Sequence, residues 1–156
     1  MKNSLIVAKI KNGTVIDHIP AGKALKVLKI LGISGEEGYR VAIVMNVESK
    51  KIGKKDIVKI ENKYLSKQEL DLIALVAPVA TINVIKDYNV VEKYKVTLPS
   101  TIKGLIKCPN PTCISRKHNE VAVSEFIVKN VNPVILECMY CKTRVYGEEI
   151  EKYLEA

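Results

Sequence analysis

Four cysteines gathered in one stretch are the residues of this sequence whose type and spacing most clearly indicate chemistry. Four residues separate Cys108 from Cys113, two separate Cys138 from Cys141, and 24 lie between the pairs, while the first 107 residues contain no cysteine. Two short cysteine loops joined by an excursion that folds back can present four thiolates to one tetrahedral ion. The spacing therefore predicts a structural zinc site with four cysteine ligands.

A disulfide or thiol redox role and an iron site are the alternatives for these cysteines. A reducing cytosol keeps thiols reduced, which favours a metal site, and a redox role for the Cys138-x2-Cys141 pair would need free thiols with a lowered pKa. Catalytic zinc usually keeps one coordination position open for water, whereas four thiolates close the site. His118, near the site in the sequence, is therefore expected to be a surface loop residue.

Composition suggests a globular protein with an anionic partner. The 156 residues are 47% hydrophobic and 27% charged, and Lys and Arg exceed Asp and Glu by 25 − 17 = 8. This excess favours nucleic acid, a nucleotide or an acidic protein surface as partner, with a solvated lysine-rich surface as the alternative. One Phe and no Trp give a base-stacking platform little support.

The N-terminal apolar run is too short for a signal peptide or a membrane span, so a cytoplasmic protein without a membrane partner is expected.

Lysines with strand periodicity are the candidate cations for such a partner. Alternation places Lys55 and Lys59 on one strand face and aligns Lys93 with Lys95 in a later strand, where they could bind phosphates or could be exposed without a ligand. The adjacent Asp17 and His18 are expected on opposite strand faces, so they predict no acid-base pair. The sequence has no nucleophile elbow, Walker loop or paired catalytic carboxylates, which indicates a protein that is not an enzyme.

The elements that position these residues follow from hydrophobic periodicity and punctuation. Residues 4–10 and 13–19 read as one bent strand or a hairpin around Asn12-Gly13, and a short helix follows Pro20 at a first helical position. A capping box at Ser66 and Glu69 begins a second helix that Pro78 ends. Further strands are expected at residues 39–47, 55–62, 80–88, 89–96, 121–130, 133–138 and 143–150.

This order predicts an α+β protein with two domains. The β-α-β-β-α-β pattern with an added edge strand is typical of a ferredoxin-like antiparallel sheet with two helices. The Pro, Ser and Gly of LPSTIKG, residues 98–104, mark a change of composition. The predicted division is residues 1–98, a linker at 99–103, and a small β zinc-ribbon-like domain at 104–156 that folds only with its metal.

Several motifs resemble the regulatory chain of aspartate carbamoyltransferase, and the resemblance runs over almost the whole chain. They are GTVIDHIP (13–20), GKKDIVKIEN (53–62), LVAPVATIN (75–83), YNVVEKY (88–94), CPNPTCIS (108–115) and ECMYCK (137–142). The resemblance implies a non-catalytic regulatory subunit of pyrimidine biosynthesis. Its allosteric domains would pair into a regulatory dimer, and its zinc domains would hold trimers of the catalytic chain.

The resemblance also implies an effector site for nucleoside triphosphates: CTP as inhibitor, ATP as activator and UTP in some members. Carried over by matching motif, the nucleotide-binding residues are Ile10, Lys11, Asp17, His18, Lys55, Lys59, Asn83, Ile85, Tyr88, Val90 and Lys93.

Each of these residue types suits a part of a nucleotide. Lys93, with His18 or Lys55, would neutralise triphosphate charge, and Asp17 could accept ribose hydroxyl hydrogens. Backbone groups near Ile10 and Tyr88 could read the base edge, with Lys59 near the ribose and base. No nucleic-acid partner is implied. The alternative function is a basic nucleic-acid-binding zinc-ribbon protein, which would show steeply salt-dependent binding and little preference for free nucleotides.

Overall fold

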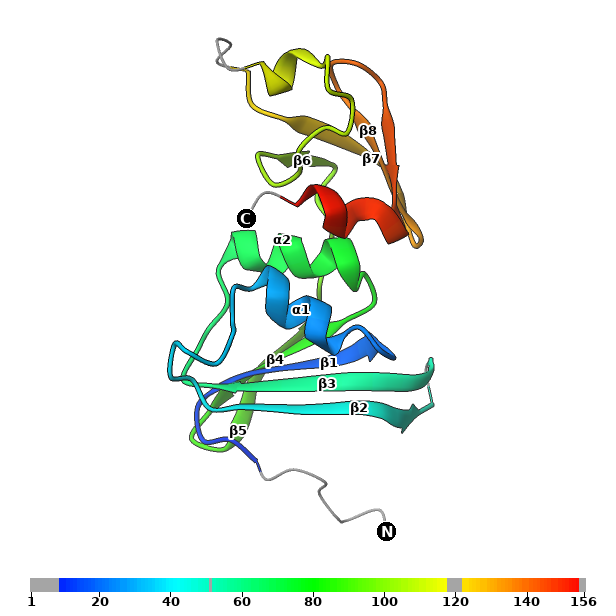
Figure 1. The fold of residues 1–156 in the computed structure, drawn as a ribbon. Coiled ribbons are helices and arrows are strands. Elements are labelled where there is room, and N and C mark those ends of the chain that lie inside the picture. Colours follow the sequence, from blue (N-terminus) through cyan, green and yellow to red (C-terminus); the bar gives the residue numbers. More distant parts are fainter. Residues whose placement is uncertain (1–8, 51, 118–121, 155–156) are drawn as a thin grey trace.

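The computed structural model describes residues 9–50, 52–117 and 122–154, which fold into two units, each built around an antiparallel sheet (Figure 1). The first sheet has the strand order β2-β3-β1-β4-β5, with two helices on one face. Its elements are β1 (Gly13–Pro20), α1 (Ala24–Ile30), β2 (Val41–Ser49), β3 (Gly53–Glu61), α2 (Lys67–Val76), β4 (Thr81–Lys86) and β5 (Asn89–Lys95). This is the ferredoxin-like pattern with a fifth strand at one edge, so the predicted α+β fold is confirmed.

Alternation along the strands separates a covered face of this sheet from an open one. In β3, Val58 and Ile60 are fully buried beneath the helices, whereas Lys55, Ile57 and Lys59 are only partly buried. Because successive strand residues point to opposite faces, the three partly buried residues share the face opposite α1 and α2. The predicted periodicity of the β3 lysines is therefore confirmed.

Apolar side chains from both helices and the central strands form one core under the covered face. Burying a Val or Ile side chain contributes about 1.5–3 kcal/mol, so the Val and Ile residues contribute more to the stability of this core than its alanines. Its fully buried members are Ile16, Ile19, Ala24, Val27, Val58, Ile60, Ile73, Ala74, Ala77 and Ala80.

The first helix begins later than the sequence predicts. Pro20 is the last residue of β1, where it pairs with Lys55, and α1 begins at Ala24. The carboxylate of Asp56 accepts hydrogen bonds from the backbone N–H groups of Gly22 and Ala24. This contact from a distant strand sets the turn between β1 and α1. The prediction of Pro20 as a first helical residue was therefore wrong.

The second helix begins at the predicted capping box. The Ser66 hydroxyl oxygen accepts from the backbone N–H of Glu69 at 3.2 Å, and the Glu69 carboxylate accepts from the backbone N–H of Ser66 at 2.9 Å. Ile73 and Ala74 of this helix are fully buried, and Leu75 is buried as well. A single amphipathic face does not explain Leu75, whose partners lie in the second unit.

The second unit is a four-stranded antiparallel sheet with the order β6-β7-β8-β9. The predicted strand over 143–150 ends early, because residues from Gly147 onward form 3₁₀ turns. The first strand of this sheet lies inside the expected linker, and the domain limits stay a prediction. The elements are β6 (Thr101–Lys103), η1 (Ile114–Arg116), β7 (Glu125–Val131), β8 (Val134–Cys138), β9 (Arg144–Tyr146) and η2 (Gly147–Tyr153).

The two units meet where α2 lies beside η2 (Figure 1). Leu75 of α2 belongs to the same buried cluster as Phe126 and Ile150 of the second unit. An ion pair of 2.9 Å joins Lys26 of α1 to Glu151 of η2 at the partly exposed rim. Helix α2 therefore contributes side chains to both cores. A displacement of one unit relative to the other would change the packing of this helix.

Asp56 ties three segments of the first unit together, because its fully buried carboxylate accepts backbone N–H bonds from Gly22 (2.8 Å), Ala24 (2.9 Å) and Asn46 (2.9 Å). Asp56→Ala would leave these donors without an acceptor, at about 1–3 kcal/mol each. We expect the free energy of unfolding to fall by about 3 kcal/mol or more in urea denaturation. Glu48→Ala, which removes an exposed carboxylate from β2, is the control, and an equal effect in both variants would contradict this role.

Candidate metal centre and nucleotide site

The four cysteines predicted as metal ligands come together at one end of the second unit. Their Sγ atoms all lie within 4.8 Å of one another, with Cys108 and Cys141 3.5 Å apart and Cys113 and Cys138 3.7 Å apart. Three of the residues are buried and Cys141 is half-buried. The predicted pairing of a loop at 108–113 with a loop at 138–141 is therefore present.

These separations suit four thiolates around one metal ion and exclude disulfides. Sulfur atoms about 2.3 Å from a tetrahedral zinc ion lie about 3.8 Å from one another. A disulfide needs two sulfurs about 2.05 Å apart, and these four cysteines are all free. The donor set and its spacing thus fit a closed, structural metal site. His118 lies outside the described residues, and the four sulfurs complete a tetrahedral set without it.

The surroundings of the thiols differ between the cysteines. Burial raises the pKa of the Cys108 and Cys138 thiols. Burial also opposes ionisation of Cys141, but hydrogen bonds from the Thr143 hydroxyl and N–H, with contributions from Asn110 and Cys108, lower the pKa of its thiol to about 6. The Cys141 thiol therefore loses its proton more readily than those of Cys108 and Cys138. A metal ion that binds all four sulfurs must displace the protons of the thiols that are still protonated.

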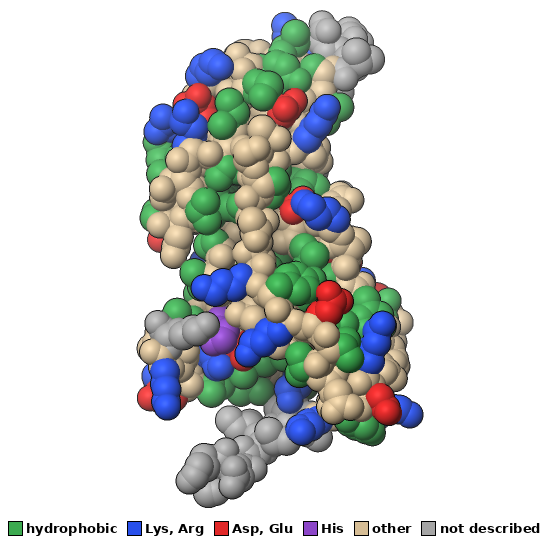
Figure 2. Space-filling model, turned by 180° about the vertical axis from the view of Figure 1, so that it is seen from behind, with side chains coloured by type: hydrophobic (Ala, Val, Ile, Leu, Met, Phe, Trp, Pro, Cys, Tyr) green, Lys and Arg blue, Asp and Glu red, His purple; other side chains and the backbone are tan. Residues whose placement is uncertain are grey.

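The open face of the first sheet carries a row of predicted nucleotide-binding residues. Strand pairing aligns Lys93 with Asn83, Asn83 with Val15, and Val15 with Lys59. Side chains of directly paired residues lie on the same face of a sheet. Residues from β5, β4, β1 and β3 are thus neighbours, with a lysine toward each end of the row. Figure 2 displays one side of the molecule, on which a histidine lies among lysine or arginine side chains.

A pocket of about 370 Å³ opens beside this row, within the size range of small-ligand sites. Burial, and secondarily the charge of Lys9, lower the pKa of Lys59 at this pocket. Six of the predicted residues line it: Ile10, Lys59, Asn83, Ile85, Tyr88 and Val90. Lys9, Val15 and Asn89 also line it and were not predicted; strand alternation from Asp17 would have indicated Val15.

Asp17, His18 and Lys55 form a second group at the end of the same face. Lys55 Nζ lies 2.9 Å from Asp17 Oδ1, and His18 Nδ1 lies 3.0 Å from Thr81 Oγ1. Thr81 pairs directly with Asp17, two residues before Asn83 on β4. This group is thus adjacent to the pocket without lining it.

The expectation that Asp17 and His18 point to opposite faces was wrong. His18 has a φ of 56°, and the pairing of β1 with β3 shifts between Ile16 and Ile19. This bulge interrupts strict alternation and turns the His18 ring toward Thr81, the partner of Asp17. The imidazole of His18 and the carboxylate of Asp17 therefore lie at the same end of the open face.

The β4–β5 turn fixes the remaining part of the site. Asp87 and Tyr88 both have positive φ, 50° and 67°, as a tight two-residue hairpin turn requires. The backbone N–H of Tyr88 donates to the Lys11 carbonyl oxygen at 2.8 Å, and that of Asp87 donates to Asn12 Oδ1 at 3.1 Å. Lys11 thus contributes its backbone, which holds the turn against the segment before β1.

Comparison with known proteins assigns both units. Residues 5–97 match the family model of the aspartate carbamoyltransferase regulatory chain, allosteric domain, and residues 100–151 match the model of its metal binding domain. The chain belongs to this family. A regulatory chain of aspartate carbamoyltransferase is a non-catalytic subunit, so the prediction that the chain is not an enzyme is confirmed.

Curated regulatory chains are similar over nearly the full length. That of Staphylothermus marinus is 68% identical over 154 residues, covering 99% of this chain and 94% of the relative. That of Hyperthermus butylicus is 56% identical over 152 residues, with 97% and 95% covered. That of Saccharolobus solfataricus is 58% identical over 149 residues, with 96% and 93% covered. No helix in the described part of this regulatory chain is long and apolar enough to cross a membrane.

The metal centre is expected to hold the second unit together. Cys138→Ala removes one of four converging thiolates, so we expect loss of bound metal and unfolding of residues 101–154 while the first unit stays folded. Metal analysis and backbone NMR spectra of the full chain measure both effects. Met139→Leu, a volume-conserving change in the same loop, is the control, and a Cys138→Ala chain with an intact second unit would contradict the expectation.

Proposed function

We propose that the first unit binds CTP and ATP, and UTP as a further effector, and that the second unit uses one zinc ion to hold the surface that binds the catalytic chain. The observation that carries this proposal is the row of lysines and the pocket on the open sheet face, in a chain whose α2 helix packs on a four-cysteine unit. The first sheet, which would carry the effector on its open face, and the metal unit are thus joined through α2.

The open face has the charges and acceptors that a nucleoside triphosphate needs. The pocket would take the base and ribose, with Lys59 donating to them and the backbone near Ile10 and Tyr88 facing the base. Lys93 and Lys55 would bind the phosphates, because an ammonium group is a compact positive charge with three hydrogen-bond donors. Asp17, which already accepts from Lys55, would hold that lysine in place and accept from a ribose hydroxyl.

The metal loops would form the contact with the catalytic chain. Ile114 directly follows Cys113 and is 42% exposed, and Tyr140 directly precedes Cys141 and is 41% exposed. Apolar side chains this exposed are common at interaction surfaces. Because each is attached to a ligand cysteine, zinc would fix their positions, and α2 would carry displacement of this surface to the effector site.

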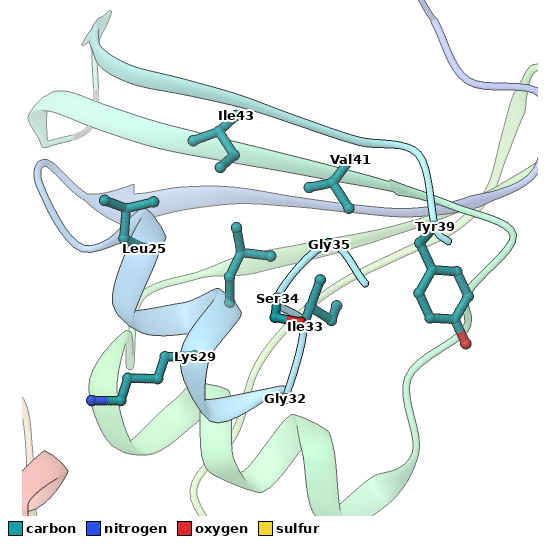
Figure 3. A pocket seen from close by; sticks show the side chains of 10 residues that line it. Leu25, Lys29, Gly32, Ile33, Ser34, Gly35, Tyr39, Val41 and Ile43 are labelled. Carbon is teal, nitrogen blue, oxygen red and sulfur yellow. The ribbon is translucent and has the colours of Figure 1, made fainter. Parts of the chain in front are cut away.

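A second copy of the chain would pair through β2, the free edge of the first sheet. This nine-residue strand has one charged residue, Glu48, whereas the opposite edge strand β5 carries Glu92, Lys93 and Lys95. Charged residues on an edge discourage strand pairing. Beside β2 lies an apolar pocket of about 620 Å³, and Figure 3 displays Leu25, Tyr39, Val41 and Ile43 around it. A paired copy would cover this surface and extend the sheet.

Calorimetric titration of the purified chain with CTP tests the effector site. Lys93→Ala removes a charge-assisted hydrogen bond of about 1.5–3 kcal/mol, so we expect CTP affinity to fall by roughly 10-fold to 100-fold.

Lys129→Ala, which removes the same charge from an exposed position on β7, is the control and is expected to keep full affinity. Equal losses in both variants would indicate only general electrostatic attraction. Absence of CTP binding together with steeply salt-dependent binding of an oligonucleotide would contradict the proposal and favour a nucleic-acid-binding protein.

Light scattering of the separated chain tests the dimer. A lysine at Ile43 would place a charge against the paired edge, so we expect Ile43→Lys to be monomeric at concentrations where the parent is dimeric. Val91→Lys adds the same charge to the opposite edge strand and is expected to leave the dimer intact. Loss of the dimer in Val91→Lys alone would contradict pairing through β2.

A further inference from the structure

Each cysteine loop carries a hydroxyl group two residues after its second cysteine. Ser115 Oγ lies 3.2 Å from Cys113 Sγ, and Thr143 Oγ1 lies 3.2 Å from Cys141 Sγ. The loops differ in length, with four residues between the cysteines of one and two between those of the other. The same contact nevertheless recurs in both, although neither hydroxyl is a metal ligand.

The hydroxyl must be the donor when a metal is bound. A coordinated cysteine is a thiolate and has no proton to give, so the hydrogen between sulfur and oxygen belongs to Ser115 or Thr143. Four thiolates around a divalent cation leave an excess of two negative charges. Hydrogen bonds donated to sulfur spread this charge and orient the lone pairs toward the metal.

Backbone N–H groups also donate to the sulfurs, and Cys141 has two further donors, the backbone N–H of Thr143 and the side chain of Asn110. Cys108 accepts from the backbone N–H of Asn110, and Cys138 accepts from those of Tyr140 and Cys141. A hydroxyl group contacts the second cysteine of each pair, which is the side-chain contact that the two loops have in common. A substitution can remove these donors without changing the backbone.

We propose that Ser115 and Thr143 are positioning residues of the metal centre, which orient the Cys113 and Cys141 thiolates and slow loss of the ion. The proposal rests on the zinc site of the proposed function. Both residues are only partly buried, so neither hydroxyl is needed to fill a core. The Thr143 carbonyl oxygen also accepts from the backbone N–H of Cys138 at 2.8 Å, and this loop contact survives a change of side chain.

The rate at which zinc leaves the full chain tests the proposal. Loss of a hydrogen-bonding partner of a metal ligand typically costs 10-fold to 100-fold in metal affinity. Transfer of zinc to a colorimetric chelator is therefore expected to be roughly 10-fold faster for Thr143→Val and for Ser115→Ala. Thr143→Ser, which keeps the hydroxyl, should restore the parent rate. Thr101→Val, which removes a hydroxyl from the exposed strand β6, should leave it unchanged.

Cobalt in place of zinc gives a readout that a purely structural role would not move. A hydrogen bond to a thiolate stabilises its lone pairs, so removing the bond should shift the thiolate-to-cobalt charge-transfer band to lower energy in Thr143→Val and Ser115→Ala, but not in Thr101→Val. Parent-like zinc release and an unshifted band in both variants would overturn the proposal. A parent chain that takes up neither metal would overturn the zinc site itself.

Discussion

Burial of helix α2 on two sides is the constraint on which the rest of the structure depends. Ile73 packs into the core of the first unit, while Leu75 packs with Phe126 and Ile150 in the second. Neither core is complete without this helix, because an apolar side chain gains its stabilisation only where it is removed from water. Since the second core also contains Cys108, the metal centre, the domain junction and the first sheet form one continuous path of packed side chains.

The same arrangement explains where the charged site lies. Both helices cover one face of the five-stranded sheet, so the opposite face is free to present polar side chains from β1, β3, β4 and β5 (Figure 1). Lys59 on β3 and Lys93 on β5 share that face, with the paired strands β1 and β4 between them. An anionic ligand bound there would strain or stabilise the strands whose other face contacts α2. Effector binding and the position of the metal unit would then be coupled without a flexible loop between them.

Local signals in the sequence predicted much of this, and long-range contacts account for what they missed. The capping box at Ser66 and the alternation in β3 depend on nearby residues, and the structure confirms both. The spacing of the cysteines predicted that they would come together, and their sulfur atoms do. The start of α1 could not be predicted, because Asp56 sets it from a distant strand. Burial of Leu75 depends on the second unit, and the bulge at His18 depends on how β1 pairs with β3. The motifs, rather than periodicity, indicated most of the residues that line the pocket on the open face.

The most direct test of regulatory coupling is the dissociation constant of CTP for the chain assembled with catalytic trimers of aspartate carbamoyltransferase, measured with and without a tight active-site inhibitor. Coupling between two sites is reciprocal and typically amounts to 5-fold to 150-fold in affinity. If the chain transmits effector binding through α2 and the metal unit, the inhibitor will change the CTP dissociation constant by about this much. An unchanged dissociation constant in an assembly that binds both ligands would contradict the coupling.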